Sequence, residues 1–141
     1  RNFGAIVRTA ESAGADTIVI PSKGSAQIGS DAVKTSAGAL NHLPICKVND
    51  FEESVKYLKE SGFLVVACTE KTDQLYSDAD LTGPVALIMG SEEDGISDSV
   101  LAMADTKVKI PMQGKIESLN VSVAAGIFLF EVVRQRMAAL K

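Results

Sequence analysis

The sequence contains no tryptophan, one histidine, two cysteines and few other aromatic residues. Cys46 and Cys68 lie within the apolar runs PICKV and LVVACT, where a free thiol ordinarily packs as a small hydrophobic side chain. We therefore expect two buried thiols rather than a disulfide or a reactive cysteine. The single histidine, His42, is distant in sequence from the main acidic cluster, so we expect it in a surface loop and expect no metal site.

The chain also lacks an excess of positive charge, because 14 basic and 18 acidic residues give a net charge of −4. This balance argues against a protein that holds nucleic acid by bulk electrostatics, although an enzyme with one local basic face remains possible. No segment resembles a signal peptide, and no charge-free run approaches the ~20 residues of a membrane span. We expect a cytoplasmic protein without membrane contact. Because the sequence begins at Arg1, without methionine and already in a helix-like pattern, we expect a fragment whose upstream part is missing.

Two common nucleotide-binding motifs are absent. The segment 90–95 has the glycine spacing of a phosphate loop, but Ile96 stands where that motif needs lysine, and Glu92, Glu93 and Asp94 would repel a triphosphate. No GxGxxG follows a first strand, which argues against a dinucleotide site and the commonest methyltransferase layout. What remains is a site of backbone amides and carbonyls with a few polar side chains. Such a site suits an adenosine that bears a cation, because nearby acids tolerate a sulfonium.

Short apolar segments alternate with helical patterns along the whole chain. This alternation predicts an α/β fold with a mainly parallel sheet flanked by helices, in one domain without repeats. The expected strands are residues 17–20, 45–48, 63–69, 85–89 and 107–110. The expected helices are residues 3–13, 32–40, 51–61, 97–103 and 121–136, with Asp50 and either Ser97 or Asp98 as caps. We expect the polar segment 70–82 to form a loop with a turn of helix.

The chain is organised around its C-terminal stretch IPMQGKIESLNVSVAAGIFLFEVVRQR, residues 110–136. A strand ends at Pro111, and a polar loop follows in which Ser118 and Asn120 have the side chains of helix N-caps. The helix beyond them carries no charge before Glu131 and is apolar nearly all round. We therefore expect it to be covered on more than one side, by its own sheet and by a second subunit or another buried element.

Parallel α/β sheets bind ligands beyond the carboxyl ends of their strands. The candidate loops therefore follow Ile20, Thr69, Met89 and Ile110. We interpret the glycines of the last two loops, Gly90, Gly95 and Gly114, as positions that need a positive φ or a close approach to the ligand.

Three segments, in this order and spacing, resemble the motifs of the SpoU (TrmH-like) branch of the SPOUT RNA methyltransferases. They are RNFGAIVRTAESAG at 1–14, VALIMGSEEDGIS at 85–97, and IPM through SLNVSVA at 110–124. The resemblance covers essentially the whole chain. Residues 25–29 and 37–48 are most similar to members that methylate a guanosine ribose in 23S ribosomal RNA, with tRNA-modifying members as the alternative. The Asp-Pro that usually precedes the first-motif asparagine, the family's first strand and the RNA-recruiting domain of many members are absent.

The resemblance implies a SPOUT-type fold with a C-terminal trefoil knot, a homodimer, and S-adenosylmethionine as cofactor. It identifies residues 1–141 as the catalytic domain without its N-terminal start, acting on a ribose 2′-hydroxyl of RNA. By match of position, the cofactor-binding residues are Thr69, Met89, Gly90, Ile110, Met112, Ser118, Leu119 and Asn120. The matching catalytic residues are Asn2, Arg8, Glu92, Ser118 and Asn120.

Arg8 has two interpretations. It lies in an otherwise apolar helical stripe, where a charge is costly without a partner, or it extends from the surface with its stem over the core. Because a guanidinium scarcely deprotonates in proteins, our hypothesis is that Arg8 holds a phosphate beside the target and stabilises the developing 2′-oxyanion. A catalytic base, the role proposed for arginine in this family, is the alternative.

The other candidates also have simpler explanations. Glu92 either orients Arg8 and the loops or favours a helix N-terminus by its charge, and Lys115 either contacts RNA or is solvated. Two different functions remain open for the chain: a non-catalytic RNA-binding or ribosome-assembly module that retains the fold, and another adenosine-ligand enzyme.

Overall fold

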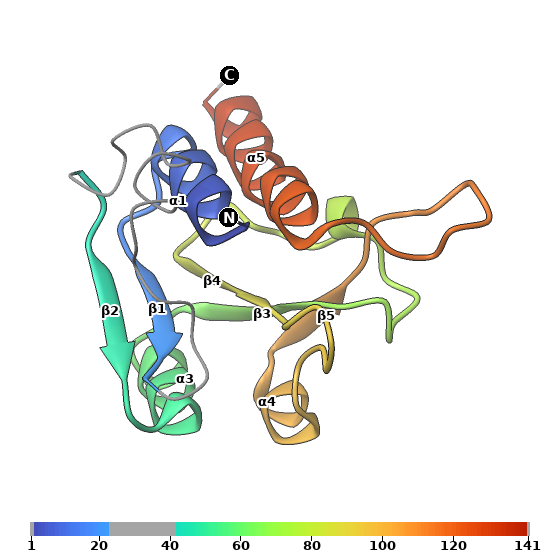
Figure 1. The fold of residues 1–141 in the computed structure, drawn as a ribbon. Coiled ribbons are helices and arrows are strands. Elements are labelled where there is room, and N and C mark those ends of the chain that lie inside the picture. The colour runs from blue at the N-terminus through green and yellow to red at the C-terminus, as the bar shows by residue number, and fades with distance from the viewer. Residues whose placement is uncertain (1, 23–41, 141) are drawn as a thin grey trace. The chain divides into compact units, whose positions relative to one another are not determined.

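The computed structural model describes residues 2–22 and 42–140 (Figure 1). The chain divides into two compact units, residues 1–54 and 55–141. The expected helix at 32–40, and the part of the central resemblance that falls within 23–41, lie outside the described residues.

In the N-terminal unit, α1 (Asn2–Ser12) follows the predicted helical period. It buries Gly4, Val7 and Ala10, which share one face because they recur every third residue. The helix ends at Gly14, whose φ of 82° lies in the left-handed region that glycine adopts without steric cost.

A two-stranded parallel sheet completes the described part of this unit. Strand β1 (Ile18–Pro21) pairs with β2 (Ile45–Val48), residue for residue from Ile18 opposite Ile45. Both strands were predicted, but Pro21 is itself the last paired residue rather than the stop. The thiol prediction is wrong for Cys46, which lies on an exposed side of β2.

The C-terminal unit contains a three-stranded parallel sheet in the order β4-β3-β5. These strands are β3 (Leu64–Cys68), β4 (Val85–Met89) and β5 (Thr106–Val108), so the predicted parallel α/β architecture is confirmed. Strand β5 begins and ends earlier than predicted. It ends at Val108 because Lys109 forms an isolated bridge with Leu75 instead of extending the ladder with β3.

Three of the described helices, α3, α4 and α5, begin at side-chain caps, which supply acceptors for first-turn amides. Asp50 Oδ1 accepts from Glu53 N at 3.0 Å at the start of α3 (Phe51–Glu60), which crosses from one unit into the other. Ser97 caps α4 (Asp98–Met103), and Asn120 caps α5 (Val121–Ala139). The alternative cap Ser118 is wrong, because it lies before the residue that caps α5.

Helix α5 packs on one face of the β4-β3-β5 sheet, and α4 lies on the opposite face (Figure 1). A short 3₁₀ helix, η2 (Tyr76–Asp78), is the turn of helix expected within 70–82. The central apolar cluster between α5 and the sheet consists of Val66, Cys68, Ala79, Leu81, Val108, Phe128 and Val132. Burial in this cluster raises the pKa of the Cys68 thiol, so Cys68 is the buried, neutral cysteine that was predicted.

Helix α5 also carries exposed apolar residues on the side away from the sheet. Val123, Phe130 and Met137 recur every seventh residue on one face and are 52%, 46% and 62% exposed. The sheet therefore provides one of the two covers that were predicted for this helix. Within the described residues, no helix combines the length and apolar character needed to cross a membrane.

Candidate functional site

The carboxyl ends of three strands meet at one edge of the C-terminal sheet. Cys68 pairs with Met89 on one side and Val108 on the other, so the chain leaves all three strands at the same level. Thr69 follows directly, is 9% exposed, and donates its backbone amide to Val108 O at 2.9 Å. The predicted cofactor positions Thr69, Met89, Gly90 and Ile110 therefore belong to one sheet edge.

The loop after β4 folds back on itself. Ser91 and Gly95 form an antiparallel bridge, and Gly95 N donates to Ser91 O at 3.0 Å. A Cβ on Gly90 would lie 2.4 Å from the carbonyl carbon of Gly95 and 2.6 Å from Ile96 N, a contact that backbone atoms cannot relieve. The glycine at position 90 is therefore required by the loop itself, while Gly95 has the predicted positive φ of 68°. Glu92, beside them, is exposed.

The loop between β5 and α5 is exposed at every residue from 111 to 120. Its apolar members Met112, Ile116 and Leu119 are 38%, 77% and 39% exposed, and Ser118 is exposed as well. Asn120 ends the loop and uses its Oδ1 to accept from Ser122 N at 2.9 Å. Of the two interpretations of Gly114, the positive φ is excluded, while a close approach to the ligand stays a prediction. A Cβ at this position would meet nothing within 4 Å.

Residues 74–81, which we call the strap, contact the chain on both sides of this exposed loop. Before the loop, Lys109 N donates to Gln74 O and Tyr76 N donates to Lys109 O, both at 2.9 Å. After the loop, Gln135 on α5 donates from Nε2 to Ala79 O at 3.0 Å and accepts from Leu81 N at 2.8 Å. The Tyr76 ring also meets Phe128 of α5 edge to face, with centroids 6.2 Å apart.

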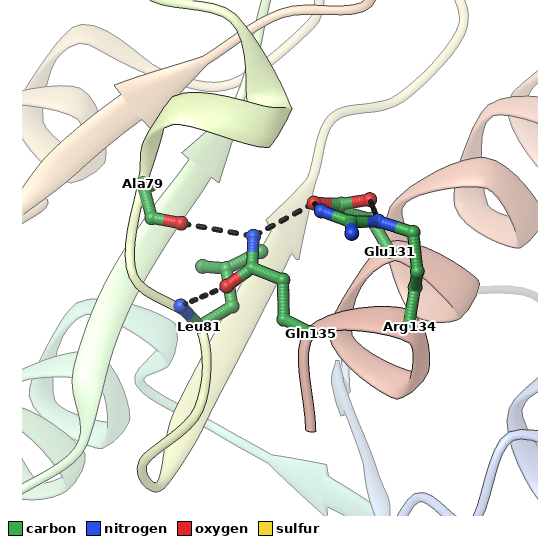
Figure 2. Close-up of polar contacts among 5 residues, drawn as sticks. All are labelled: Ala79, Leu81, Glu131, Arg134 and Gln135. Carbon is green, nitrogen blue, oxygen red and sulfur yellow. Dashed lines mark hydrogen bonds and ion pairs between the residues drawn. The ribbon is translucent and has the colours of Figure 1, made fainter. Parts of the chain in front are cut away.

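A buried carboxylate fixes the orientation of Gln135. Figure 2 shows Glu131 between Arg134 and Gln135, with the Gln135 amide extending to Ala79 and Leu81. Glu131 is 6% exposed and accepts from Gln135 Nε2 at 2.7 Å and from Arg134 Nε and Nη2 at 2.8 and 2.9 Å. The hydrogen bonds from Arg134 hold the pKa of the Glu131 carboxyl below its usual range, against the opposing effect of burial. The sequence analysis assigned no role to Gln135. The signal that could have indicated one is the pair of polar residues, Glu131 and Gln135, on a mainly apolar helix.

Asn2 and Arg8 belong to the N-terminal unit, whereas all other predicted site residues belong to the C-terminal unit. Arg8 is exposed, which supports the second of its two interpretations, a side chain that extends from the surface, over a place within the buried stripe of α1. It follows Val7 by about 100° around the helix, which turns it away from the face of Gly4, Val7 and Ala10. Asn2 is partly buried at the first position of α1. The proximity of Arg8 to the loops at Gly90 and Gly114 stays a prediction.

Across residues 2–22 and 42–140, no three His, Cys, Asp or Glu side chains gather in a way that would hold a metal ion. The chemistry visible at the sheet edge is that of backbone donors and acceptors, with hydroxyl and amide side chains.

Comparison with known proteins identifies the arrangement. Residues 1–130 match the model of the SpoU rRNA Methylase family. An uncharacterized tRNA/rRNA methyltransferase of Archaeoglobus fulgidus is 44% identical over 136 residues, which cover 96% of this chain and 60% of that protein. The 23S rRNA (guanosine-2′-O-)-methyltransferase RlmB of Vibrio parahaemolyticus is 42% identical, with 98% of this chain and 56% of that protein covered.

A solved structure agrees with these relatives. The SpoU methyltransferase AviRb from Streptomyces viridochromogenes, in complex with the cofactor AdoMet, superposes with a TM-score of 0.87 at 32% identity, covering 97% of this chain and 56% of AviRb. The chain thus spans between half and two thirds of the length of these three proteins. The match of the family model to nearly the whole sequence establishes that the chain belongs to the SpoU rRNA methylase family.

Proposed function

We propose that residues 1–141 form the catalytic domain of an S-adenosylmethionine-dependent RNA methyltransferase that acts on a ribose 2′-oxygen, with a guanosine of 23S rRNA as its target. The observation that carries the proposal is the common sheet edge from which Thr69, Gly90 and Ile110 leave. Family membership and the printed activity of the RlmB relatives support the reaction and the substrate. A tRNA target is the alternative, since the Archaeoglobus fulgidus relative carries both RNA classes in its name.

The residues at this edge fit the cofactor. An adenosine with a sulfonium needs backbone donors and acceptors and an environment without opposing positive charge, and the loop after β4 offers exposed acids in Glu92, Glu93 and Asp94. Bound S-adenosylmethionine would supply an activated methyl group. The residues proposed to hold it are Thr69, Met89, Gly90, Ile110, Met112, Ser118, Leu119 and Asn120. Because the side-chain oxygen of Asn120 caps α5, this residue would contact the cofactor through its amide nitrogen or its backbone.

Arg8 is proposed to bind the phosphate beside the target nucleotide and to stabilise negative charge on the ribose oxygen. Its exposure on α1 leaves the guanidinium accessible to RNA, and its planar array of donors matches phosphate oxygens. A guanidinium scarcely gives up its proton, so Arg8 is not assigned the part of base. Asn2, Glu92, Ser118 and Asn120 complete the proposed catalytic set.

Titration of the protein with S-adenosylmethionine in a calorimeter tests this function. We expect saturable heat with a dissociation constant in the micromolar range and no saturable heat with ATP, since residues 90–96 lack the lysine of a phosphate loop. A titration with S-adenosylmethionine that gives no heat would favour the two other functions, a non-catalytic RNA-binding or ribosome-assembly module and a different adenosine-ligand enzyme.

We further propose that the protein is a homodimer in which a second copy covers the exposed face of α5. Val123, Phe130 and Met137 form an apolar row on this face, and Leu119 precedes the helix with 39% of its surface exposed. Such a row is what a self-complementary interface presents, because a twofold axis places the same residues on both sides. The remaining proposals, a C-terminal trefoil knot and a cytoplasmic location, follow from family membership and from the RNA substrate. In a knotted chain, the residues after β5 would pass the strap before the last helix begins. The contacts of the strap with both Lys109 and α5 are compatible with such a path.

The substitution Phe130→Glu is expected to convert the dimer into a monomer. It places a charge in the middle of the apolar row, where burial against a second copy would desolvate it. Light scattering after size-exclusion chromatography measures the change. The matched control is Tyr57→Glu, which places the same charge at an aromatic residue that is 70% exposed on α3. A wild-type protein that elutes as a monomer at micromolar concentration would contradict the interface.

A further inference from the structure

The strap joins the two ends of the exposed loop that the proposed function assigns to the cofactor. Residues 111–120 are exposed throughout, so their conformation depends on how the ends of the loop are held. One end is Lys109, which exchanges two backbone hydrogen bonds of 2.9 Å with Gln74 and Tyr76. The other end is the first residue of α5, and Gln135, about 20 Å further along this helix, attaches the helix to Ala79 and Leu81. The strap therefore holds one end of the loop directly and the other end through α5.

Gln135 is the link in this arrangement that a single substitution removes. Its side-chain amide donates to the carbonyl of Ala79 and accepts from the backbone N–H of Leu81, as the backbone of a neighbouring strand would. Glu131, 6% exposed, accepts from the same Gln135 nitrogen at 2.7 Å and so stabilises the orientation in which the nitrogen faces Ala79 and the oxygen faces Leu81 (Figure 2). Without Gln135, Ala79 O and Leu81 N would lose these partners at residues that are themselves 7% and 0% exposed.

We propose that Gln135, oriented by Glu131, is a positioning residue that preorganises the loop 110–120 for S-adenosylmethionine by fixing α5 to the strap. The inference rests on the proposed function. A loop whose ends are held at a set separation loses less conformational freedom when it closes on a ligand, so the attachment favours binding. Gln135 itself does not touch the cofactor, and its effect passes through the strap and the start of α5.

The test compares Gln135→Leu with Arg136→Leu. Leucine at 135 is close in size to glutamine but makes neither hydrogen bond to the strap. The control, Arg136→Leu, removes the hydrogen bond of 2.7 Å that Arg136 donates to Gly83 O, which lies outside the strap. We expect Gln135→Leu to weaken S-adenosylmethionine binding by about tenfold or more, because the loop that is no longer held has to be ordered when the cofactor binds. Arg136→Leu is expected to bind like the wild type.

Two further measurements separate positioning from a loss of folding. At saturating S-adenosylmethionine, the single-turnover methyl-transfer rate of Gln135→Leu is expected to match the wild type, because the reacting groups are intact. Hydrogen exchange is expected to accelerate at the Leu81 amide and along residues 109–120. Glu131→Gln, which keeps a side-chain oxygen for Gln135 but loses the ion pair with Arg134, is expected to weaken binding less, and it carries the test if Gln135→Leu does not fold.

Normal cofactor affinity in a folded Gln135→Leu protein whose Leu81 amide exchanges rapidly would overturn the proposal. So would a fall in the rate at saturating cofactor with affinity unchanged. If the wild type binds no S-adenosylmethionine, the proposed function fails by itself. In that case, unchanged exchange along residues 109–120 in the variant would separately reject the positional coupling, and accelerated exchange would support it.

Discussion

Replacing Gly90 by alanine is expected to weaken S-adenosylmethionine binding by at least about tenfold while the protein remains folded. The added Cβ would lie 2.4 Å from the carbonyl carbon of Gly95 and 2.6 Å from its Cα, so the loop after β4 has to open. Overpacking of this kind costs about 1–3 kcal/mol, which the core of the C-terminal unit is expected to tolerate. Calorimetry gives the affinity, and thermal unfolding gives the stability.

Gly83→Ala is the matched control for this change. A Cβ at position 83 would meet nothing within 4 Å, and this glycine is not among those with a positive φ. Its affinity for S-adenosylmethionine is expected to equal that of the wild type. Equal affinity for Gly90→Ala as well would remove the loop after β4 from the cofactor site.

Arg8→Ala is expected to lower the single-turnover rate of methyl transfer by about 10²–10³-fold with RNA and cofactor both bound, the range found when one donor to a developing oxyanion is removed. The side chain is exposed on α1 and packs into no core, so the loss of activity should come without a loss of folding. Measuring the rate against pH tests the assigned role. Because a guanidinium does not titrate in this range, the shape of the pH profile should stay the same when Arg8 is removed.

Arg8→Lys provides the control for charge alone. Lysine keeps the positive charge but lacks the planar fork of donors, so a rate between those of the wild type and Arg8→Ala is expected. A near-normal single-turnover rate for Arg8→Ala with bound RNA would eliminate Arg8 from the reaction. A profile whose pH dependence disappears with Arg8 would instead favour the role of base.

Local patterns in the sequence predicted the regular elements because those elements depend on neighbouring residues. The helical period of α1, the Asp50 and Asn120 caps and the apolar strand 85–89 all follow from the conformational preferences of a few adjacent positions. The common sheet edge of the candidate loops could then be predicted as well, because parallel strands place their carboxyl ends together.

The strap could not be predicted in this way. Its attachment joins Gln135 to backbone groups that are 54 and 56 positions away, and a bond between a side chain and a distant backbone leaves no periodic trace in the sequence. The face of Arg8 stayed open in the sequence because its neighbours are apolar, whereas the helix buries every third residue from Gly4 and turns position 8 outward. Cys46 was misjudged for a similar reason, since apolar neighbours in a strand do not determine which side is covered.

Transfer of a tritium-labelled methyl group from S-adenosylmethionine to RNA tests the central claim most directly. Incubation of the protein with unmodified 23S rRNA, followed by nuclease digestion and nucleotide mapping, is predicted to place the label on the 2′-oxygen of a single guanosine. Label on a base, or no label in 23S rRNA or in total RNA while the protein binds S-adenosylmethionine, would contradict the assignment of this chain as a ribose methyltransferase.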